Sequence, residues 1–116
     1  MLSHVSIRVT DLEASVQFYL AALRPLSFQE MRFPTVIGLG PGSPTAPIPE
    51  MWLRQHTAGP QNDHASKPTP VHISFRVSDQ KLVHEFHAAA IAAGGTDNGP
   101  PGERPWMKGY YGMPPS

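Results

Sequence analysis

The chain contains no cysteine, no long apolar run and no excess of charge of either sign. Without cysteine, neither a disulfide framework nor thiolate chemistry is available. Nine Lys and Arg residues balance nine Asp and Glu residues, so nothing indicates nucleic acid or an anionic membrane as a partner. No stretch approaches the roughly 20 apolar residues of a membrane-spanning helix, and the first residues lack the pattern of a secretory signal. We therefore expect a cytoplasmic protein with a single domain over residues 1–116.

Proline, in contrast, is abundant, with 14 in 116 residues. The prolines concentrate in three stretches, 41–49, 60–70 and 100–115. Because proline donates no backbone hydrogen bond, it avoids the interior of helices and sheets. We expect loops in all three stretches.

A repeated stretch organises the chain. Residues 4–11 (HVSIRVTD) return 68 positions later as residues 72–79 (HISFRVSD), and five of the eight positions are identical. Solenoid repeats have shorter periods, usually about 20–50 residues, so the pattern indicates a duplicated supersecondary unit. We predict a first module over 1–56, a linker over 57–69 and a second module over 70–116.

The first module reads as a strand, a helix and three more strands. Apolar and polar residues alternate over 2–9, with His4 and Arg8 on the polar side, which predicts a half-buried strand. Thr10 and Glu13 have the spacing of a capping box, which predicts a helix that runs to about Leu23 and stops before Pro25. The remaining pattern predicts strands over 27–33, 35–40 and 50–54, with a loop over 41–49.

The second module begins in the same way but does not continue in the same way. We expect a strand from Val71 and a helix that starts at an N-cap Ser78 and ends near Ala93, before Gly94-Gly95. Beyond the helix only 109–112 hints at a strand. The second module is therefore predicted to be incomplete, which leaves a sheet edge for a second copy to pair with in a homodimer.

These modules resemble those of the vicinal oxygen chelate superfamily, which includes glyoxalases, bleomycin-resistance proteins and extradiol dioxygenases. The resemblance is carried by residues 4–13 with Phe18-Tyr19, by 51–53, by 71–76, and by 92–95 leading to Tyr110-Tyr111. It implies an α+β fold in which paired βαβββ modules form a curled, cup-like sheet with the helices outside.

The resemblance also implies a divalent metal, Zn, Fe, Ni or Mn, held in the cup. His4 and His72 match the first-strand ligand positions of the family, and imidazole suits all four metals. Trp52 matches the fourth-strand position of the first module but cannot ligate, so Glu50, one pleat earlier, becomes the candidate. The alternatives are two ordinary exposed histidines, a surface carboxylate at Glu50, or a third ligand from a partner chain.

Four further residues are candidates for contact with a substrate. Arg8 and Arg76 form a symmetric pair that either reaches solvent or holds a substrate carboxylate. Trp52 and Tyr110 either pack within the protein or line an apolar cup, together with Trp106.

Two classes of function follow from the resemblance. The first is a metal-dependent lyase, isomerase or dioxygenase that acts on a small oxygen-chelating substrate. The alternative is a metal-free protein of the bleomycin-resistance type that binds or sequesters a small molecule, or an inactive truncated product. Binding of an aromatic ligand that is unaffected by a chelator would favour the second class over the first.

Overall fold

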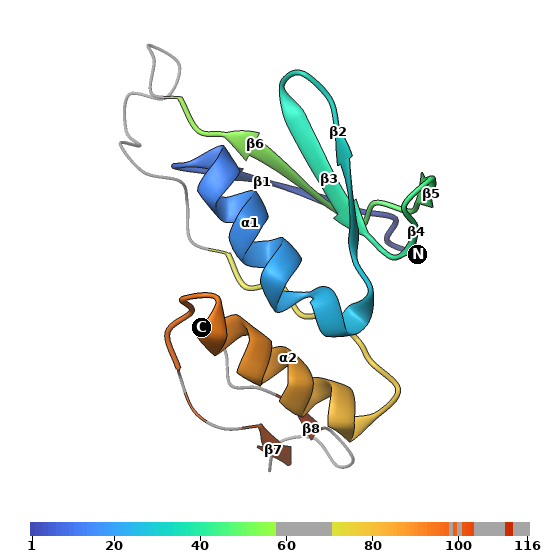
Figure 1. The fold of residues 1–116 in the computed structure, drawn as a ribbon, viewed down its shortest axis with the longest axis vertical. Coiled ribbons are helices and arrows are strands. Elements are labelled where there is room, and N and C mark those ends of the chain that lie inside the picture. Colours follow the sequence, from blue (N-terminus) through green and yellow to red (C-terminus); the bar gives the residue numbers. More distant parts are fainter. Residues whose placement is uncertain (58–70, 98, 100, 104–110, 113–116) are drawn as a thin grey trace.

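The computed structural model of the chain has the predicted α+β architecture, with an open mixed sheet and α-helices (Figure 1). The structure describes residues 1–57, 71–97, 99, 101–103 and 111–112. Within them the helical elements are α1 (Leu12–Ala22), the short 3-10 helix η1 (Arg24–Leu26) and α2 (Gln80–Ala92). The strands are β1 (Val5–Val9), β2 (Gln29–Arg32), β3 (Val36–Gly40), β4 (Gly42–Ser43), β5 (Ala46–Pro47), β6 (Met51–Gln55), β7 (Gly102–Glu103) and β8 (Tyr111–Gly112).

The main sheet has the strand order β1-β6-β3-β2, with β1 and β6 parallel and the other neighbours antiparallel. Side chains on a strand alternate between the two faces of the sheet. On one face Leu39, Met51 and Leu53 are fully buried, and α1 contributes the fully buried Val16 and Leu23 to the same core. The hydrophobic core therefore lies between α1 and one face of this sheet.

The four strands predicted for the first module are confirmed. The first three have narrower bounds than predicted, and β6 is shifted by one residue toward the C-terminus. The loop predicted over 41–49 is corrected, because it contains the short β4–β5 hairpin, in which Gly42 pairs with Pro47. Gly42 has φ +117°, a conformation that glycine adopts readily and other residues rarely adopt. This freedom allows the chain to turn back immediately after β3.

Both predicted N-caps are wrong by one residue. Asp11, rather than Thr10, caps α1 by accepting a hydrogen bond from the Ala14 amide at 3.1 Å. The predicted capping box does not form because α1 begins at Leu12, which leaves Thr10 one residue before the N-cap, and the Glu13 carboxylate accepts hydrogen bonds from Arg32 on β2.

In the second module, the equivalent Asp79 replaces Ser78 as the cap of α2 and accepts from the Lys81 amide at 2.8 Å. The predicted end of α2 is confirmed. Gly94 has φ +105°, its amide donates to the Ile91 carbonyl, and the Gly95 amide donates to the Ala90 carbonyl. This pair of bonds is a Schellman motif, which satisfies the last carbonyls of the helix.

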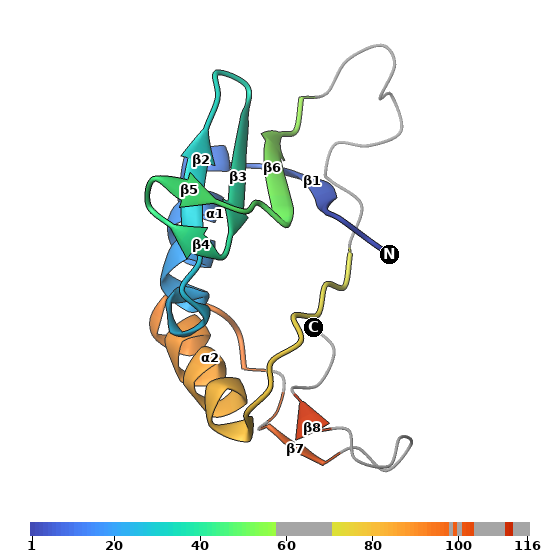
Figure 2. The same cartoon turned by 90° about the vertical axis from the view of Figure 1, so that its right-hand side faces the viewer.

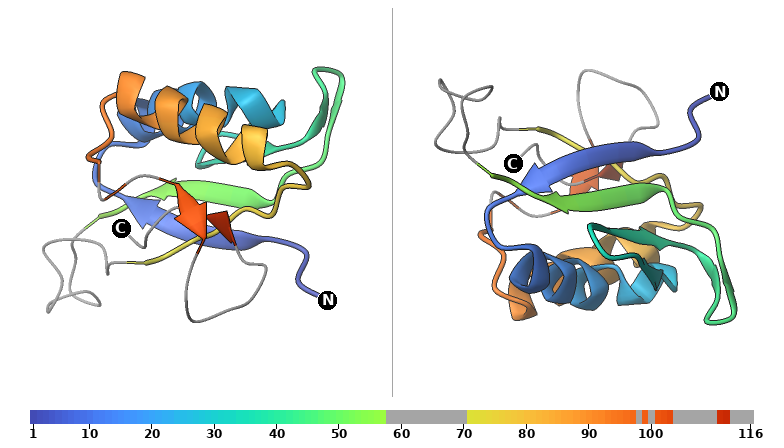
Figure 3. Two further views of the ribbon diagram at one scale, coloured as in Figure 1. Left: turned by 90° about the horizontal axis from the view of Figure 1, so that it is seen from below. Right: turned by 90° about the horizontal axis from the view of Figure 1, so that it is seen from above.

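The two α-helices lie next to each other on one side of the molecule, and β1 and β6 lie on the other side (Figure 3). The predicted placement of the helices outside the sheet is therefore confirmed. Among the described residues, no helix is long and apolar enough to cross a membrane.

For the strand predicted from Val71, the alternation of buried and exposed side chains is confirmed, but the pairing with a neighbouring strand is not found among the described residues. Ile73, Phe75 and Val77 are half-buried while the residues between them are exposed. The Phe75 ring lies 5.3 Å from that of Phe28 and 6.5 Å from that of Phe86. Yet within the described ranges this segment joins no sheet, and Figure 2 draws it as a yellow trace leading to α2. An alternating sequence determines which side chains point inward, but the backbone hydrogen bonds of a sheet also require a neighbouring strand.

Candidate functional site

The face of the main sheet away from α1 is where the family resemblance predicted the site. We call it the open face, and the strand register defines its residues, because residues paired across strands point to the same side. Its central row runs from Met31 through Gly38 and Trp52 to Ser6, and the next row from Val36 through Arg54 to Arg8. Ser6, Arg8 and Arg54 are exposed and Trp52 is half-buried.

His4 and Glu50 stand at the same end of two adjacent strands. Each immediately precedes a paired residue, since Val5 pairs with Met51, and the Val5 amide donates to the Glu50 carbonyl at 2.9 Å. Both side chains are exposed, and His4 Nδ1 lies 3.2 Å from the Ser3 hydroxyl. Two of the three predicted metal ligands are therefore close neighbours in the fold.

A groove of about 700 Å³ runs between the two modules, and we call it the module groove. It contains two predicted site residues, Glu50 from the first module and Arg76 from the second. Phe28 and Phe75, whose rings meet edge to face, contribute an aromatic wall. The other lining residues are Pro25, Leu26, Ser27, Pro41, Ser74, Val77, Ser78 and Leu82.

The third predicted ligand does not join the first two. His72 is exposed, and it is not among the residues that line the module groove. Across the described part of the chain, no three His, Cys, Asp or Glu side chains gather as a metal site requires. A divalent metal held by two donors is weakly bound, so these residues do not by themselves fit the metal centre of the family. Tyr110 and Trp106 lie outside the described residues.

The Trp52 ring packs over Gly38, where the absence of a side chain leaves room for it. A Cβ placed on Gly38 would stand 2.9 Å from the Trp52 ring and 3.0 Å from Pro49 Cβ. The ring of Phe33 lies 5.9 Å from that of Trp52, with 36° between their planes, and Phe33 is 52% exposed. The two rings form an aromatic surface of which the sequence predicted only Trp52.

Arg54 was also missed as a site residue. The sequence places it on the same side of its strand as Trp52, but only the strand order reveals that Arg8 pairs with it. In the part of the chain that the structure describes, neither arginine belongs to an ion pair. Two guanidinium groups therefore share the open face, and no carboxylate of the described residues pairs with either of them.

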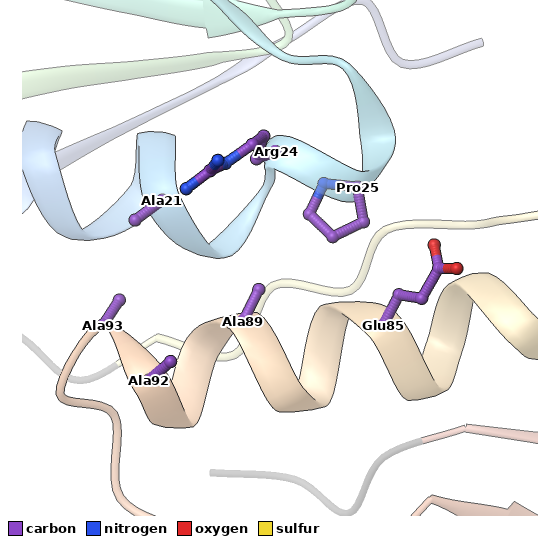
Figure 4. Close-up of a pocket in the computed structure, with 7 residues that line it drawn as sticks. All are labelled: Ala21, Arg24, Pro25, Glu85, Ala89, Ala92 and Ala93. Atoms are coloured by element: carbon purple, nitrogen blue, oxygen red, sulfur yellow. The ribbon is translucent and has the colours of Figure 1, made fainter.

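A second hollow, of about 390 Å³, lies where the end of α1 and η1 face α2 (Figure 4). Ala21, Ala89, Ala92 and Ala93 form much of its wall, with Arg24, Pro25 and Glu85 beside them. Alanine side chains are too short to fill the space between two helices, which accounts for the hollow. No predicted site residue lies in it.

The sequence profile of the Glyoxalase/Bleomycin resistance protein/Dioxygenase superfamily matches residues 1–112 of this chain. No curated protein matches it significantly.

Three solved structures resemble the fold. A glyoxalase/bleomycin resistance protein from Albidiferax ferrireducens T118 aligns with a TM-score of 0.63 and 29% identity, over 88% of this chain and 80% of that one. A glyoxalase/bleomycin resistance protein/dioxygenase family enzyme from Burkholderia phytofirmans PsJN aligns with a TM-score of 0.56 and 28% identity. The alignment covers 80% of this chain and 72% of that one. A glyoxalase/bleomycin resistance protein/dioxygenase from Nocardioides aligns with a TM-score of 0.50 and 21% identity, over 91% of this chain and 70% of that one. At this identity the likeness supports the fold alone.

Proposed function

Because this chain belongs to the Glyoxalase/Bleomycin resistance protein/Dioxygenase superfamily, we propose that it binds a small oxygen-bearing organic molecule in a site between its two modules. The proposed site consists of the module groove and the adjoining open face, and binding needs no metal. This is the function of a binding or sequestering protein of the bleomycin-resistance type.

The module groove is the observation that carries this proposal. Its volume of about 700 Å³ lies in the usual range for small-molecule sites. Such sites combine apolar walls with a few polar groups that orient the ligand. Phe28 and Phe75 supply the apolar wall, while Glu50 and Arg76 supply a carboxylate and a guanidinium from opposite modules.

The chemistry of these groups suggests how a ligand is held. The Arg76 guanidinium has five N–H donors in a fixed plane, which suits a carboxylate or two neighbouring oxygens of a ligand. The Glu50 carboxylate accepts from a hydroxyl or an amine. A molecule with oxygen atoms at one end and an apolar body would place the apolar body against Phe28 and Phe75.

A metal-dependent enzyme of the family is the second candidate, and the position of His4 beside Glu50 favours it. The imidazole and the carboxylate would be two ligands of a divalent metal, with the third supplied by a second copy of the chain in a homodimer. Metal content per chain, measured by mass spectrometry on untagged protein and on His4→Ala, tests this candidate. Near-stoichiometric metal that is lost in the variant would replace the metal-free proposal.

The binding proposal is tested by a screen of small carboxylates, dicarbonyls and catechols, read out by ligand-observed NMR with and without EDTA. We expect binders whose affinity is unchanged by EDTA and falls about tenfold in Arg76→Ala, since a charge-assisted hydrogen bond contributes roughly 1.5–3 kcal/mol. Arg24→Ala, which removes an exposed arginine outside the groove, is the matched control. A folded protein that binds none of these compounds would contradict the proposal.

A further inference from the structure

We propose that the open face selects aromatic carboxylates, with the carboxylate held between Arg8 and Arg54 and the aromatic ring against Trp52. This inference rests on the proposed function, because the open face is the part of the proposed site that lies outside the module groove, and the inference names the class of ligand bound on that face. It adds Arg54 and Phe33 to the residues that contact the ligand.

The arginine pair is a consequence of the strand register. β1 and β6 are parallel, and Arg8 pairs with Arg54 just as Ser6 pairs with Trp52. Neighbouring strands lie about 4.8 Å apart, and paired side chains point to the same side. Both arginines are exposed on the open face, so their guanidinium groups can converge on one ligand oxygen pair.

Like charges placed opposite each other in a sheet destabilise it. Nothing in the described part of the chain offsets this repulsion, because neither arginine is in an ion pair. On the open face, Glu50 lies immediately before β6 and four residues before Arg54, and no ion pair between Glu50 and either guanidinium is found among the described residues. A bound anion would neutralise the pair, and a carboxylate matches the planar donors of arginine.

The neighbouring row supplies the surface for a ring. Trp52 is two residues before Arg54 on the same strand, so their Cα atoms are about 7 Å apart on one face. The Gly38 backbone supports the indole from below, and the half-exposed Phe33 stands beside it at 5.9 Å between ring centres. Aromatic rings prefer offset-stacked or edge-to-face partners at such separations. A ring stacked on Trp52 can therefore direct a carboxyl substituent toward Arg54 and Arg8.

Two ligands of the same shape, 2-naphthoate and the neutral 2-naphthamide, separate charge from stacking. Their affinities are measured by isothermal titration calorimetry at low salt. We expect naphthoate to bind the unaltered protein about tenfold or more tightly than naphthamide, since charge-assisted hydrogen bonds are the stronger ones. Arg54→Gln and Arg8→Gln should each remove most of this preference and leave naphthamide binding unchanged.

Two further variants complete the test. Trp52→Leu should weaken both ligands alike, because it removes the ring surface and keeps the charges. Arg24→Gln, an exposed arginine on η1, should change neither affinity. Thermal melting of each variant verifies that it is folded.

Equal affinities of the two ligands, or a preference that survives in both arginine variants, would overturn the aromatic-carboxylate inference while small-molecule binding stands. If neither naphthalene compound binds but the screen above finds other ligands, the inference is also wrong and the proposed function stands. A folded chain that binds no compound in either experiment would contradict both the inference and the proposed function.

Discussion

Arg32 and Glu13 form a bidentate ion pair that joins β2 to the first turn of α1. Arg32 Nη2 donates to Glu13 Oε1 at 2.7 Å, and Nη1 donates to Oε2 at 3.0 Å. The same guanidinium also lies 3.2 Å from the Glu30 carboxylate. Gln17, one turn further along α1, also donates to Glu13 Oε1 at 3.3 Å. The hydrogen bonds from Arg32 first, and that from Gln17 second, hold the pKa of Glu13 below its ordinary value. The pair links a helix and a strand that are separated by the core.

The first prediction concerns the pH dependence of this pair. A carboxyl whose pKa is lower in the folded state stabilises the fold above its unfolded pKa, and this contribution is lost as the pH falls through the folded pKa. The contribution of Glu13 is therefore complete above about pH 4.5, its ordinary value, and is lost below it. Because both side chains are exposed, the effect is small.

Melting temperatures of the parent protein and Glu13→Gln, compared at pH 7 and pH 3, test this prediction. The difference between the two proteins should be small at pH 7 and should become smaller at pH 3, because the contribution of a carboxyl with a lowered pKa is lost on acidification. Glu85→Gln, in which the lost partner is a looser i,i+4 lysine at 3.8 Å, is the control. A difference that grows on acidification would contradict the assigned role of Glu13.

The second prediction concerns the cap of α2. Asp79→Ala removes the side chain that accepts from the Lys81 amide at 2.8 Å, and loss of such a cap costs about 1 kcal/mol of stability. Ser78→Ala should be nearly neutral, although the sequence favoured Ser78 as the cap. Urea unfolding of the two variants measures the free energies. The prediction fails if Ser78→Ala is the more destabilised of the two.

The third prediction concerns the glycine beneath Trp52. Gly38→Ala places a Cβ 2.9 Å from the indole ring and 3.0 Å from Pro49, so one of these groups must move. Overpacking of this kind costs roughly 1–3 kcal/mol. Gly102→Ala is the control, because a Cβ there would meet nothing within 4 Å. Chemical denaturation compares the two, and the Trp fluorescence maximum should shift only in Gly38→Ala. An unchanged maximum and stability would show that the indole does not lie on Gly38.

The fourth prediction concerns the contact between the modules. Phe75 packs against Phe28 of the first module and Phe86 of α2, so Phe75→Ala should destabilise the protein by about 2–4 kcal/mol. Val71→Ala, in the same segment but 57% exposed, should cost far less. Urea unfolding measures both. If Phe75→Ala leaves the stability unchanged, segment 71–77 does not join the two modules through this side chain.

Local patterns predicted the elements of the fold because their causes are local. The alternation around Val5 and Ile73 decides which side chains turn inward, whatever strand lies beside them. Pro25 and Gly94 end their helices through the geometry of the backbone at those residues. The same reasoning missed Asp11 as a cap because Thr10 and Asp11 are both favourable cap residues, and the pattern alone does not fix the residue at which the helix begins.

The sequence by itself therefore determined the α+β class and the face to which the side chains of each main-sheet strand point, since a period of two residues is set within the strand. Only the tertiary structure decided which residues stand side by side. The pairing of Arg8 with Arg54 depends on β1 lying next to β6, and the approach of Phe33 to Trp52 depends on β3 lying beside β6. Such lateral neighbours come from strand order, which is a long-range property of packing, and the proposed binding surface is built from them.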